Sequence, residues 1–374
     1  MAPSKTFYGK SESFAVQKLK REIPASMKKN LYKKSKGFFA ELYENPFDKK
    51  SFISCGVDGV GSKALLASLM NKYDTIGQDL VAMNANDLAS IPMTKPFLFL
   101  NYIAAQDKIL EKGITAKIMK GIVKGLRQAD ANKILNSNFV LNLGKGETAF
   151  MNELIADQDG FGFDLAGAMI GFVEKKYAKI NVKPGMDIIA LKSSGIHSNG
   201  MTVARHLLLN GRFEKSKKFR KLYKGKFGLN YRLPNGKKLG LELLTPTMIY
   251  SKVVAKIAKK FPSIVCVNNT GFGLKNLTRF GGNTEFLIHS PFPPAGIFSF
   301  IKENSSLNWK QMYETFNMGH GFFVLCKKKD TKKILGLIKK EKIQARVIGE
   351  TRKGRCKVVL NADFIGKPLV FKGY

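Results

Sequence analysis

The sequence predicts a two-domain protein of the α/β or α+β class with mixed sheets flanked by helices. Its 374 residues are more than a single compact core usually needs. Candidate strands and helices alternate in both halves of the chain, and a Lys-rich stretch with a Pro-Gly turn at residues 174–185 separates two apolar regions. We therefore expect a basic N-terminal segment at residues 1–50, a first domain at residues 51–175 and a second domain at residues 176–374.

The first half begins with an amphipathic stretch at residues 36–43, which is expected to be helical. Residues 51–57 are apolar and β-branched and run into a glycine turn, so they predict a strand. Helical spacing of leucines begins at residue 63, and a second helix is expected from about residue 78. The remaining expectations for this half are a strand at 97–104, an amphipathic helix at 115–129 and strands at 138–143 and 163–173.

The second half repeats this alternation. Residues 187–191 are an apolar run that predicts a strand, and residues 200–209 have the spacing of a helix. The later elements are expected to be helices at 247–260 and 331–340 and strands at 322–326 and 345–350.

Composition narrows the class of protein. The formal net charge is +35, which would attract polyanions and help to steer a phosphorylated substrate. No apolar run reaches the roughly 20 residues of a membrane span, and the N-terminal region lacks an apolar signal core, so we expect a cytoplasmic protein without a membrane partner. Four widely separated cysteines and four histidines do not match the spacing of a zinc site.

An island of acidic residues stands out in this basic chain. Residues 56–87 contain four aspartates, Asp58, Asp74, Asp79 and Asp87, but only two lysines. Carboxylates close to a glycine turn are suited to magnesium that carries a nucleotide. The alternative is that the helix from residue 78 simply exposes a polar stripe to solvent.

The glycine turn itself is a near match to a phosphate-binding loop. In GVDGVGSK, residues 56–63, Ser62 precedes Lys63, whereas a Walker loop has the reverse order. Its glycines, Gly59 and Gly61 among them, still permit close approach of a phosphate, which Lys63 could contact while Asp58 held magnesium. The same glycines could equally form an ordinary structural turn.

Two further loops carry candidate site residues. GKGET at residues 144–148 places Glu147 after a glycine turn, although a helix cap at Thr148 explains the same pattern. SSGIHSNG at residues 193–200 lies between a predicted strand and a predicted helix, where hydroxyl and amide groups can bind phosphate. His197 in this loop could donate a hydrogen bond or act as an acid or base.

Residues 212–238 combine many basic residues with five aromatic residues. Such a segment could bind single-stranded nucleic acid without sequence specificity through phosphate contacts and stacking. A solvated loop in a lysine-rich protein is the simpler interpretation.

Seven motifs together resemble the phosphoribosylformylglycinamidine cyclo-ligase (aminoimidazole ribonucleotide synthetase) family. They are DGVGSK at 58–63, YDTIGQDLVAMNANDL at 73–88, GETA at 146–149, FDLAGAMIGFVEK at 163–175, SSGIHSNG at 193–200, LTPTMIYSKVV at 244–254 and FNMGHGFFV at 316–324. The resemblance implies a homodimer with the fold of that family and an ATP- and Mg²⁺-dependent cyclisation of formylglycinamidine ribonucleotide. In that reaction the formyl amide oxygen is activated by phosphoryl transfer, and an internal nitrogen then displaces phosphate.

The resemblance also assigns roles to individual residues. Asp58, Asp87 and His197 are expected to be catalytic, and Asp58, Asp79 and Asp87 to hold the metal. ATP is expected to contact Gly59, Gly61, Lys63, Asp79, Asn84, Gly146, Glu147 and Thr148, and the phosphorylated substrate to contact Ser193, Ser194, Gly195, Ser198 and Asn199.

This sequence departs from the family pattern at several positions. An early glycine-rich loop of the family is replaced by residues 33–39, and a second acid after GETA is replaced by Phe150. Asn101 stands where the family has an aspartate, and the family's histidine before its Thr-Gly turn is replaced in the stretch from Asn268 to Gly273. A catalytically weakened paralogue that binds nucleic acid or another polyanion, or a different ATP-using enzyme of the same superfamily, is therefore the alternative.

Overall fold

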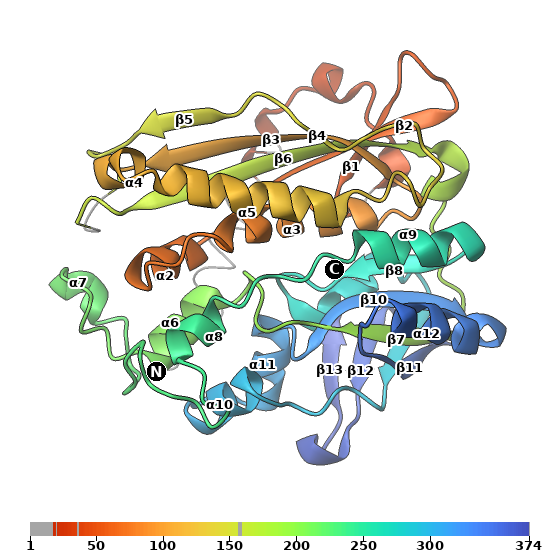
Figure 1. Ribbon diagram of the computed structural model, residues 1–374. Helices are drawn as coiled ribbons and strands as arrows, with labels where there is room; N and C mark the ends of the chain where they lie inside the picture. The colour runs from red at the N-terminus through yellow and green to blue at the C-terminus, as the bar shows by residue number, and fades with distance from the viewer. Residues whose placement is uncertain (1–17, 20, 36, 156–158, 374) are drawn as a thin grey trace.

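The computed structural model describes residues 18–19, 21–35, 37–155 and 159–373. Two mixed sheets are formed by different parts of the chain, residues 41–174 and residues 186–372, and helices flank both sheets (Figure 1). The predicted fold class is confirmed. The expectations for residues 1–17, 20 and 36 lie outside the described residues.

The first sheet has the strand order β1-β2-β6-β3-β4, and β5 also pairs with β3. Strands β1, β2, β6 and β3 are antiparallel neighbours, whereas β4 and β5 run parallel to β3. The elements of this part are η1 (Ala25–Lys28), η2 (Lys33–Ser35), β1 (Glu41–Glu44), β2 (Ser51–Gly59), α2 (Lys63–Leu69), α3 (Ile76–Ala89), β3 (Lys95–Ala105), α4 (Asp107–Glu111), α5 (Ile114–Ala129), β4 (Asn142–Leu143), β5 (Glu147–Phe150) and β6 (Phe163–Glu174).

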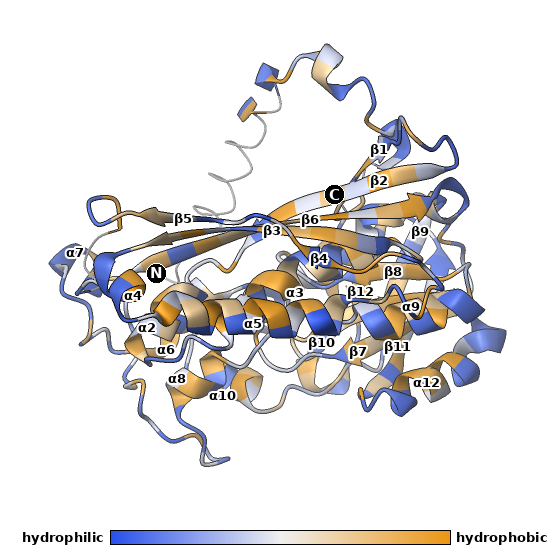
Figure 2. Ribbon diagram, turned by 45° about the horizontal axis from the view of Figure 1, so that its top comes forward, coloured by the Kyte–Doolittle hydropathy of each residue, from blue (hydrophilic) through white to orange (hydrophobic). Residues whose placement is uncertain are grey.

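Helices α3 and α5 lie between the first sheet and the second half of the molecule (Figure 1). Two glycines allow these helices to approach closely. A Cβ at Gly77 would lie 2.2 Å from the Ile118 carbonyl oxygen, and a Cβ at Gly121 would lie 2.6 Å from the Asp74 carbonyl oxygen. In Figure 2, α5 carries both hydrophobic and hydrophilic residues, as expected for a helix with one buried face.

The second sheet has the strand order β13-β12-β9-β11-β7-β10-β8, in which only the β12–β9 pair is parallel. Alternate residues of strand β10, which lies between β7 and β8, enter two different cores. Phe322 and Val324 pack in a cluster with α9 and α12, whereas Phe323 and Leu325 belong to the larger core.

The bounds of the elements in this part follow the chain from the first sheet to the C-terminus. They are η3 (Lys175–Ala178), β7 (Met186–Lys192), α6 (Met201–Leu208), α7 (Lys217–Arg220), α8 (Leu239–Leu243), α9 (Ser251–Lys260), β8 (Val265–Asn268), η4 (Gly273–Phe280), β9 (Thr284–Ile288), α10 (Ile297–Glu303), α11 (Trp309–Thr315), β10 (His320–Lys327), η5 (Lys328–Asp330), α12 (Thr331–Lys340), β11 (Ala345–Lys353), β12 (Lys357–Leu360), η6 (Asp363–Ile365) and β13 (Leu369–Lys372).

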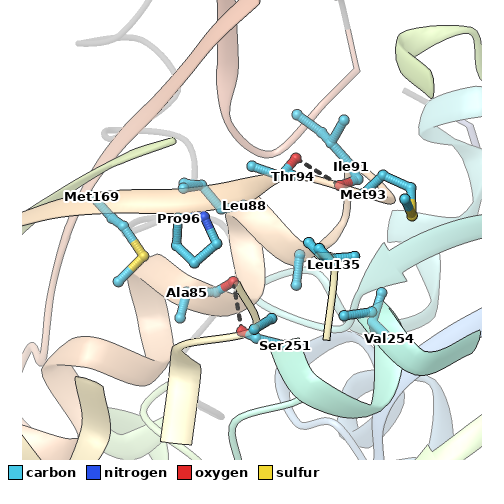
Figure 3. A pocket seen from close by; sticks show the side chains of 13 residues that line it. Ala85, Leu88, Ile91, Met93, Thr94, Pro96, Leu135, Met169, Ser251 and Val254 are labelled. Carbon is cyan, nitrogen blue, oxygen red and sulfur yellow. Dashed lines mark hydrogen bonds between the residues drawn. The ribbon is translucent and has the colours of Figure 1, made fainter. Parts of the chain in front are cut away.

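Helices α3 and α9 meet where the two halves of the molecule join. A cavity of about 20 Å³, large enough for about one water molecule, lies between them and is lined almost entirely by apolar side chains (Figure 3). The Ser251 hydroxyl donates a hydrogen bond to the Ala85 carbonyl oxygen across this seam, at 3.4 Å. The contact joins the first residue of α9 to the middle of α3.

The predicted helix at residues 36–43 is wrong. Residues 41–44 form strand β1, in which Leu42 is fully buried between the more exposed Glu41 and Tyr43. This alternation has the two-residue period of a strand, and β1 pairs with β2. The predicted strand at residues 138–143 is also shorter, since only Asn142–Leu143 pair with β3. The other predicted helices and strands are present, with shifted ends.

A short segment connects the two sheets, and the cysteines are not paired. The stretch at residues 174–185 that predicts the domain boundary begins with the last residue of the first sheet's strand β6 and leads directly into β7 of the second sheet. All four cysteines are free thiols, and Cys266 and Cys326 are buried. Within the described part of the chain, we find no helix with the length and apolar character that crossing a membrane requires.

Candidate active site

Asp58 and Asp87 form an acidic pair near the C-terminal ends of strand β2 and helix α3. Asp58 is the penultimate residue of β2, and Asp87 lies in the last turn of α3. Burial raises the pKa of Asp87 to about 7. A hydrogen bond from Asn268 Nδ2 to Asp87 Oδ1, at 2.8 Å, and the charge of Arg279 act in the opposite direction, and the charge of Asp58 raises the pKa further.

This pair fits a magnesium ion that is shared with a phosphate. Mg²⁺ commonly binds to one or two carboxylates and completes its shell with water and phosphate oxygens. A carboxylate whose pKa is raised by burial and by a second carboxylate would be relieved by a cation. Among the described residues, no group of three or more His, Cys, Asp or Glu side chains could hold a metal. A metal enclosed by protein ligands alone is therefore not supported there.

A row of small and polar residues crosses the sheet from Asp58. Gly167 on β6 is paired with Asp58 on one side and with Asn101 on the other, and a Cβ at Gly146 would lie 2.7 Å from Asn101 Oδ1. Asn84 of α3 lies over this row, because its Nδ2 is 3.4 Å from the Asp58 carbonyl oxygen and would be 3.2 Å from a Cβ at Gly167. The Oδ1 atoms of Asn84 and Asn101 are buried and accept no hydrogen bond from described residues.

The other residues assigned to ATP lie around this row. The Gly59 amide donates to Asp58 Oδ1 at 2.7 Å, and Gly61, with φ of +55°, lines a hollow of about 360 Å³ beside α2. Glu147 and Thr148 are exposed on strand β5, next to β3. The alternative of a helix cap at Thr148 is wrong, because the residue lies in a strand.

Lys63 and Asp79 pair with each other in the interior. Neither side chain has exposed surface, and Lys63 Nζ lies 2.7 Å from Asp79 Oδ1. Lys63 also donates to the Thr245 carbonyl oxygen at 2.7 Å, and both the amide and the hydroxyl of Thr247 donate to Asp79 Oδ1. Asp79 Oδ2 is buried and accepts no hydrogen bond from described residues. Contacts of Lys63 with phosphate and of Asp79 with metal stay predictions.

The loop of residues 193–200 is fixed by Asn317, a residue of the FNMG motif. Asn317 Oδ1 accepts hydrogen bonds from the Ser193 hydroxyl at 2.8 Å and from the Gly319 amide at 2.9 Å. Its Nδ2 donates to the carbonyl oxygens of Gly195 and Ile196, each at 2.9 Å. One amide side chain therefore satisfies four groups of the loop and its surroundings.

Three of the residues assigned to the substrate line a common hollow. Ser193, Ser194 and Gly195 lie, together with residues 293 and 295–298, around a space of about 210 Å³. Asn199 instead donates to the Thr270 hydroxyl at 2.8 Å, which ties the loop to the turn after Asn268. The Ser198 hydroxyl is buried and has no hydrogen-bond partner among the described residues.

His197 is neutral at physiological pH. Burial, and secondarily the charge of Lys63, lower the pKa of His197 to about 3. Its Nε2 accepts a hydrogen bond from the Ser194 amide at 3.4 Å, so we assign the proton to Nδ1. This environment favours the hydrogen-bonding alternative over an acid or base that titrates near neutral pH.

Arg279 and Asn268 are site residues that were not assigned from the sequence. Asn268 ends β8 and Arg279 lies in η4, which follows it. Asn268 hydrogen-bonds to Asp87 and the charge of Arg279 lowers the pKa of Asp87, although both residues lie more than 180 positions from Asp87 in the chain. Asn268 was noted only as a departure from the family. For Arg279 the only available signal was an arginine a few residues beyond a glycine turn, which is common in a chain with 63 Lys and Arg residues.

The segment that replaces the family's glycine-rich loop packs against Arg279. A Cβ at Gly37 would lie 2.7 Å from the Arg279 carbonyl oxygen. The Arg279 guanidinium lies 4.3 Å from the centre of the Phe39 ring, a cation–π contact. The N-terminal segment thus reaches the arginine that influences Asp87, although Lys36 lies outside the described residues.

The aromatic residues of segment 212–238 are largely used within the fold. Tyr223 and Phe227 are each 8% exposed, and Phe227 packs on Tyr231 and Phe300. Only Phe219 and Tyr231 expose a large part of their rings. The structure therefore gives no support to a stacking platform for nucleic acid and agrees with a solvated loop built around α7.

Comparisons with known proteins agree with these motifs. Residues 43–173 match the family described as "AIR synthase related protein, N-terminal domain", and residues 183–361 match the corresponding C-terminal domain. The chain is 35% identical to the phosphoribosylformylglycinamidine cyclo-ligase of Pyrococcus horikoshii over 295 residues, 78% of this chain and 77% of that protein. It is 34% identical to the enzyme of the same name from Bacillus cereus over 351 residues, 91% of this chain and 92% of that protein.

Solved structures resemble the chain in fold alone. A chain of the HypE–HypF complex superposes with a TM-score of 0.56 at 14% identity and covers 90% of this chain and 93% of its own length. The hydrogenase maturation protein HypE in complex with ATP gives a TM-score of 0.52 at 14% identity, with 86% of this chain and 85% of that chain covered.

Proposed function

The chain belongs to the AIR synthase family, and we propose that it catalyses the ATP-dependent cyclisation of formylglycinamidine ribonucleotide to aminoimidazole ribonucleotide, a step of purine biosynthesis. The observation that carries this proposal is the acidic pair Asp58–Asp87, which lies at the joint between the two halves in a chain that matches cyclo-ligases over most of its length. A small phosphorylated substrate also agrees with the strongly basic surface.

In the proposed reaction the γ-phosphoryl group of ATP is transferred to the formyl amide oxygen, and ADP is released. The ring-forming nitrogen then attacks the activated carbon, the carbon–oxygen bond breaks, and inorganic phosphate leaves. Phosphoryl transfer needs positioning and charge neutralisation more than covalent help from the protein. Mg²⁺ held by Asp58 and Asp87 would neutralise phosphate charge, and Arg279 beside Asp87 is suited to the same task.

We further propose that ATP lies along the row that starts at Asp58. Asn84 over the row, and Gly59, Gly61 and Gly146 beside it, offer polar atoms or room for close approach of the nucleotide. Glu147 and Thr148 at the open edge would contact the outer part of the nucleotide. Ser193, Ser194, Gly195, Ser198 and Asn199 are proposed to bind the ribonucleotide, and neutral His197 is proposed to orient this loop.

A homodimer through the first sheet is part of the proposal. The face of this sheet opposite α3 carries partly exposed apolar side chains from its three central strands, among them Ile53, Val57, Leu100 and Phe172. Val57 is 77% exposed. A second copy that packed on this face would bury these apolar side chains. A cytoplasmic location is proposed on the same grounds as the activity.

The direct test is turnover by the purified protein. Incubation with ATP, Mg²⁺ and formylglycinamidine ribonucleotide should yield ADP, phosphate and the aminoimidazole product in equal amounts. Asp87→Asn should abolish turnover without loss of folding, whereas Asp74→Asn, at an exposed turn aspartate paired with Lys72, should retain it. A folded wild-type protein that forms no aminoimidazole product would rule the proposal out.

A further inference from the structure

Residues 245–251, which belong to the LTPTMIYSKVV motif, connect α3 to the loop of residues 193–197. Six residues of this connecting segment hydrogen-bond, through backbone or side chain, to α3, to the loop, to Lys192 directly before the loop or to Lys63. The bonds are Lys63 Nζ to Thr245 O (2.7 Å), Ser194 Oγ to Pro246 O (2.6 Å), Thr247 N and Oγ1 to Asp79 Oδ1 (2.7 and 2.6 Å), Asn86 Nδ2 to Met248 O (2.8 Å), Tyr250 N to Asn86 Oδ1 (2.9 Å), Tyr250 Oη to Lys192 O (2.8 Å) and Ser251 Oγ to Ala85 O (3.4 Å).

The N-terminal part of the connecting segment, at Thr245 and Thr247, is held by the buried ion pair of Lys63 and Asp79. Asp79 Oδ1 accepts three hydrogen bonds, from Lys63 Nζ and from the amide and hydroxyl of Thr247. Lys63 and Asp79 are completely buried, so both charges have lost their hydration. Such a pair contributes little net stability compared with apolar residues, but it fixes the geometry of the groups that satisfy it. Here those groups are Thr245 and Thr247 of the connecting segment.

The other side of the connecting segment holds the substrate loop. The Ser194 hydroxyl donates to the Pro246 carbonyl oxygen, and the Ser194 amide in turn donates to His197 Nε2. The fully buried Tyr250 donates to the Lys192 carbonyl oxygen, directly before the loop. A displacement of the connecting segment would therefore move Ser194 and His197 with it.

Asn86, which binds the connecting segment twice, precedes Asp87 of the acidic pair. Helix α3 therefore positions both parts of the site. It holds the loop of residues 193–197 through the connecting segment, and it carries Asp87 of the acidic pair itself. We propose that Lys63 and Asp79 are positioning residues, which hold the connecting segment in register with α3 and so align the loop at Ser194 and His197 with the Asp58–Asp87 pair. The inference rests on the proposed function and gives it a specific alignment device.

Thr247 offers a test that leaves the ion pair in place. Thr247→Val removes one hydrogen bond to Asp79 but keeps the shape of the side chain and its amide contact. We expect kcat/KM for the ribonucleotide to fall about tenfold, with a weaker Kd for the ribonucleotide, while the Kd for Mg²⁺–ATP changes by less than about twofold. Thr247→Ser, which restores the hydroxyl, should recover most of the loss.

Thr94→Val is the matched control. Thr94 is also a buried threonine, but its hydroxyl donates to the Ile91 carbonyl oxygen at 2.7 Å, so this hydrogen bond joins two residues outside the connecting segment (Figure 3). This variant should lower the melting temperature by a comparable amount and leave kcat/KM and both Kd values within about twofold of wild type. A purely structural role of Thr247 would make the two variants behave alike.

Several outcomes would overturn the proposal. If Thr247→Val binds the ribonucleotide and turns it over like wild type, the connecting segment does not position the loop. If Lys63→Met, examined as a folded protein, weakens Mg²⁺–ATP binding as strongly as it weakens ribonucleotide binding, Lys63 acts on the nucleotide instead. If wild-type protein binds the ribonucleotide but forms no product, the proposed function fails, and the positioning role is then decided by the ribonucleotide Kd of Thr247→Val.

Discussion

Divalent-cation binding to the acidic pair should weaken on acidification through pH 7. The pKa of Asp87 is raised to about 7, so in the metal-free protein this carboxyl is mostly protonated below that pH and mostly ionised above it. A cation and a proton compete for the same carboxylate, and binding of the cation must therefore release a proton. The cation affinity is fully present above pH 7 and is lost as the pH falls below it.

The size of the effect follows from the pKa. At pH 8 about one tenth of the Asp87 carboxyls carry a proton, and at pH 6 about nine tenths do. The apparent Kd of the cation should therefore rise about tenfold between pH 8 and pH 6. Burial has the largest effect on this midpoint; the hydrogen bond from Asn268 lowers the pKa, the charge of Asp58 raises it and the charge of Arg279 lowers it.

Mn²⁺ binding followed by the electron paramagnetic resonance of the free ion would measure this effect without nucleotide, whose own phosphate titrates in the same range. Displacement by Mg²⁺ would then report the physiological ion. In Asp87→Asn the pH dependence should disappear together with most of the affinity, and in Asn268→Ala the midpoint should move to higher pH. Equal Kd values at pH 6 and pH 8 in wild type, or an unchanged pH dependence in Asp87→Asn, would refute the reasoning.

Three further predictions concern the buried groups and the sheet face. Lys63→Met should lower the free energy of unfolding by about 3–5 kcal/mol in denaturant titrations, because it leaves the Asp79 carboxylate buried without its counterion, and adding Asp79→Leu should restore much of the loss. Because its pKa is about 3, His197 stays neutral from pH 5.5 to pH 8, so the ratio of wild-type to His197→Gln turnover should not change across that range in a pH–rate profile. Val57→Asp should convert a dimer to monomers in sedimentation analysis, whereas the equally exposed Leu154→Asp, outside the sheet, should not.

Local sequence patterns were sufficient to predict most helices and strands of the fold. The apolar run at residues 97–104 and the helical spacing of residues 115–129 predict β3 and α5, because burial on one or both faces leaves a regular signal in the sequence. The failure at residues 36–43 has a physical cause. In a stretch this short, one buried residue, Leu42, between two exposed neighbours is compatible with either period, and pairing with β2 decides in favour of the strand.

The candidate site was predictable only where its residues lie close together in the chain. Asp58 and Asp87 are conspicuous because they belong to an island of acidic residues in a basic chain, but nothing in the sequence connects Asp87 to Asn268 or Lys63 to Thr245. These contacts depend on how the second half of the molecule docks on α3. The complete burial of Lys63 is equally inaccessible to sequence reasoning, since an exposed lysine after a glycine turn would look the same.

The residues that depart from the family pattern determine the charge of the candidate site. Asn101 lies in the row beside Gly146, and Phe150, at the far end of β5, is 63% exposed, so neither position supplies a carboxylate. Asn268 meets Asp87 as a neutral donor. When both carboxyls are ionised, the pair Asp58–Asp87 carries two negative charges, which one divalent cation balances. Phosphate charge beyond that cation would fall to Arg279, whose guanidinium packs on the ring of Phe39 in the segment that replaces the family's glycine-rich loop. The segment that stands in place of the family's glycine-rich loop would thus contribute through its contact with Arg279 rather than through glycine amides.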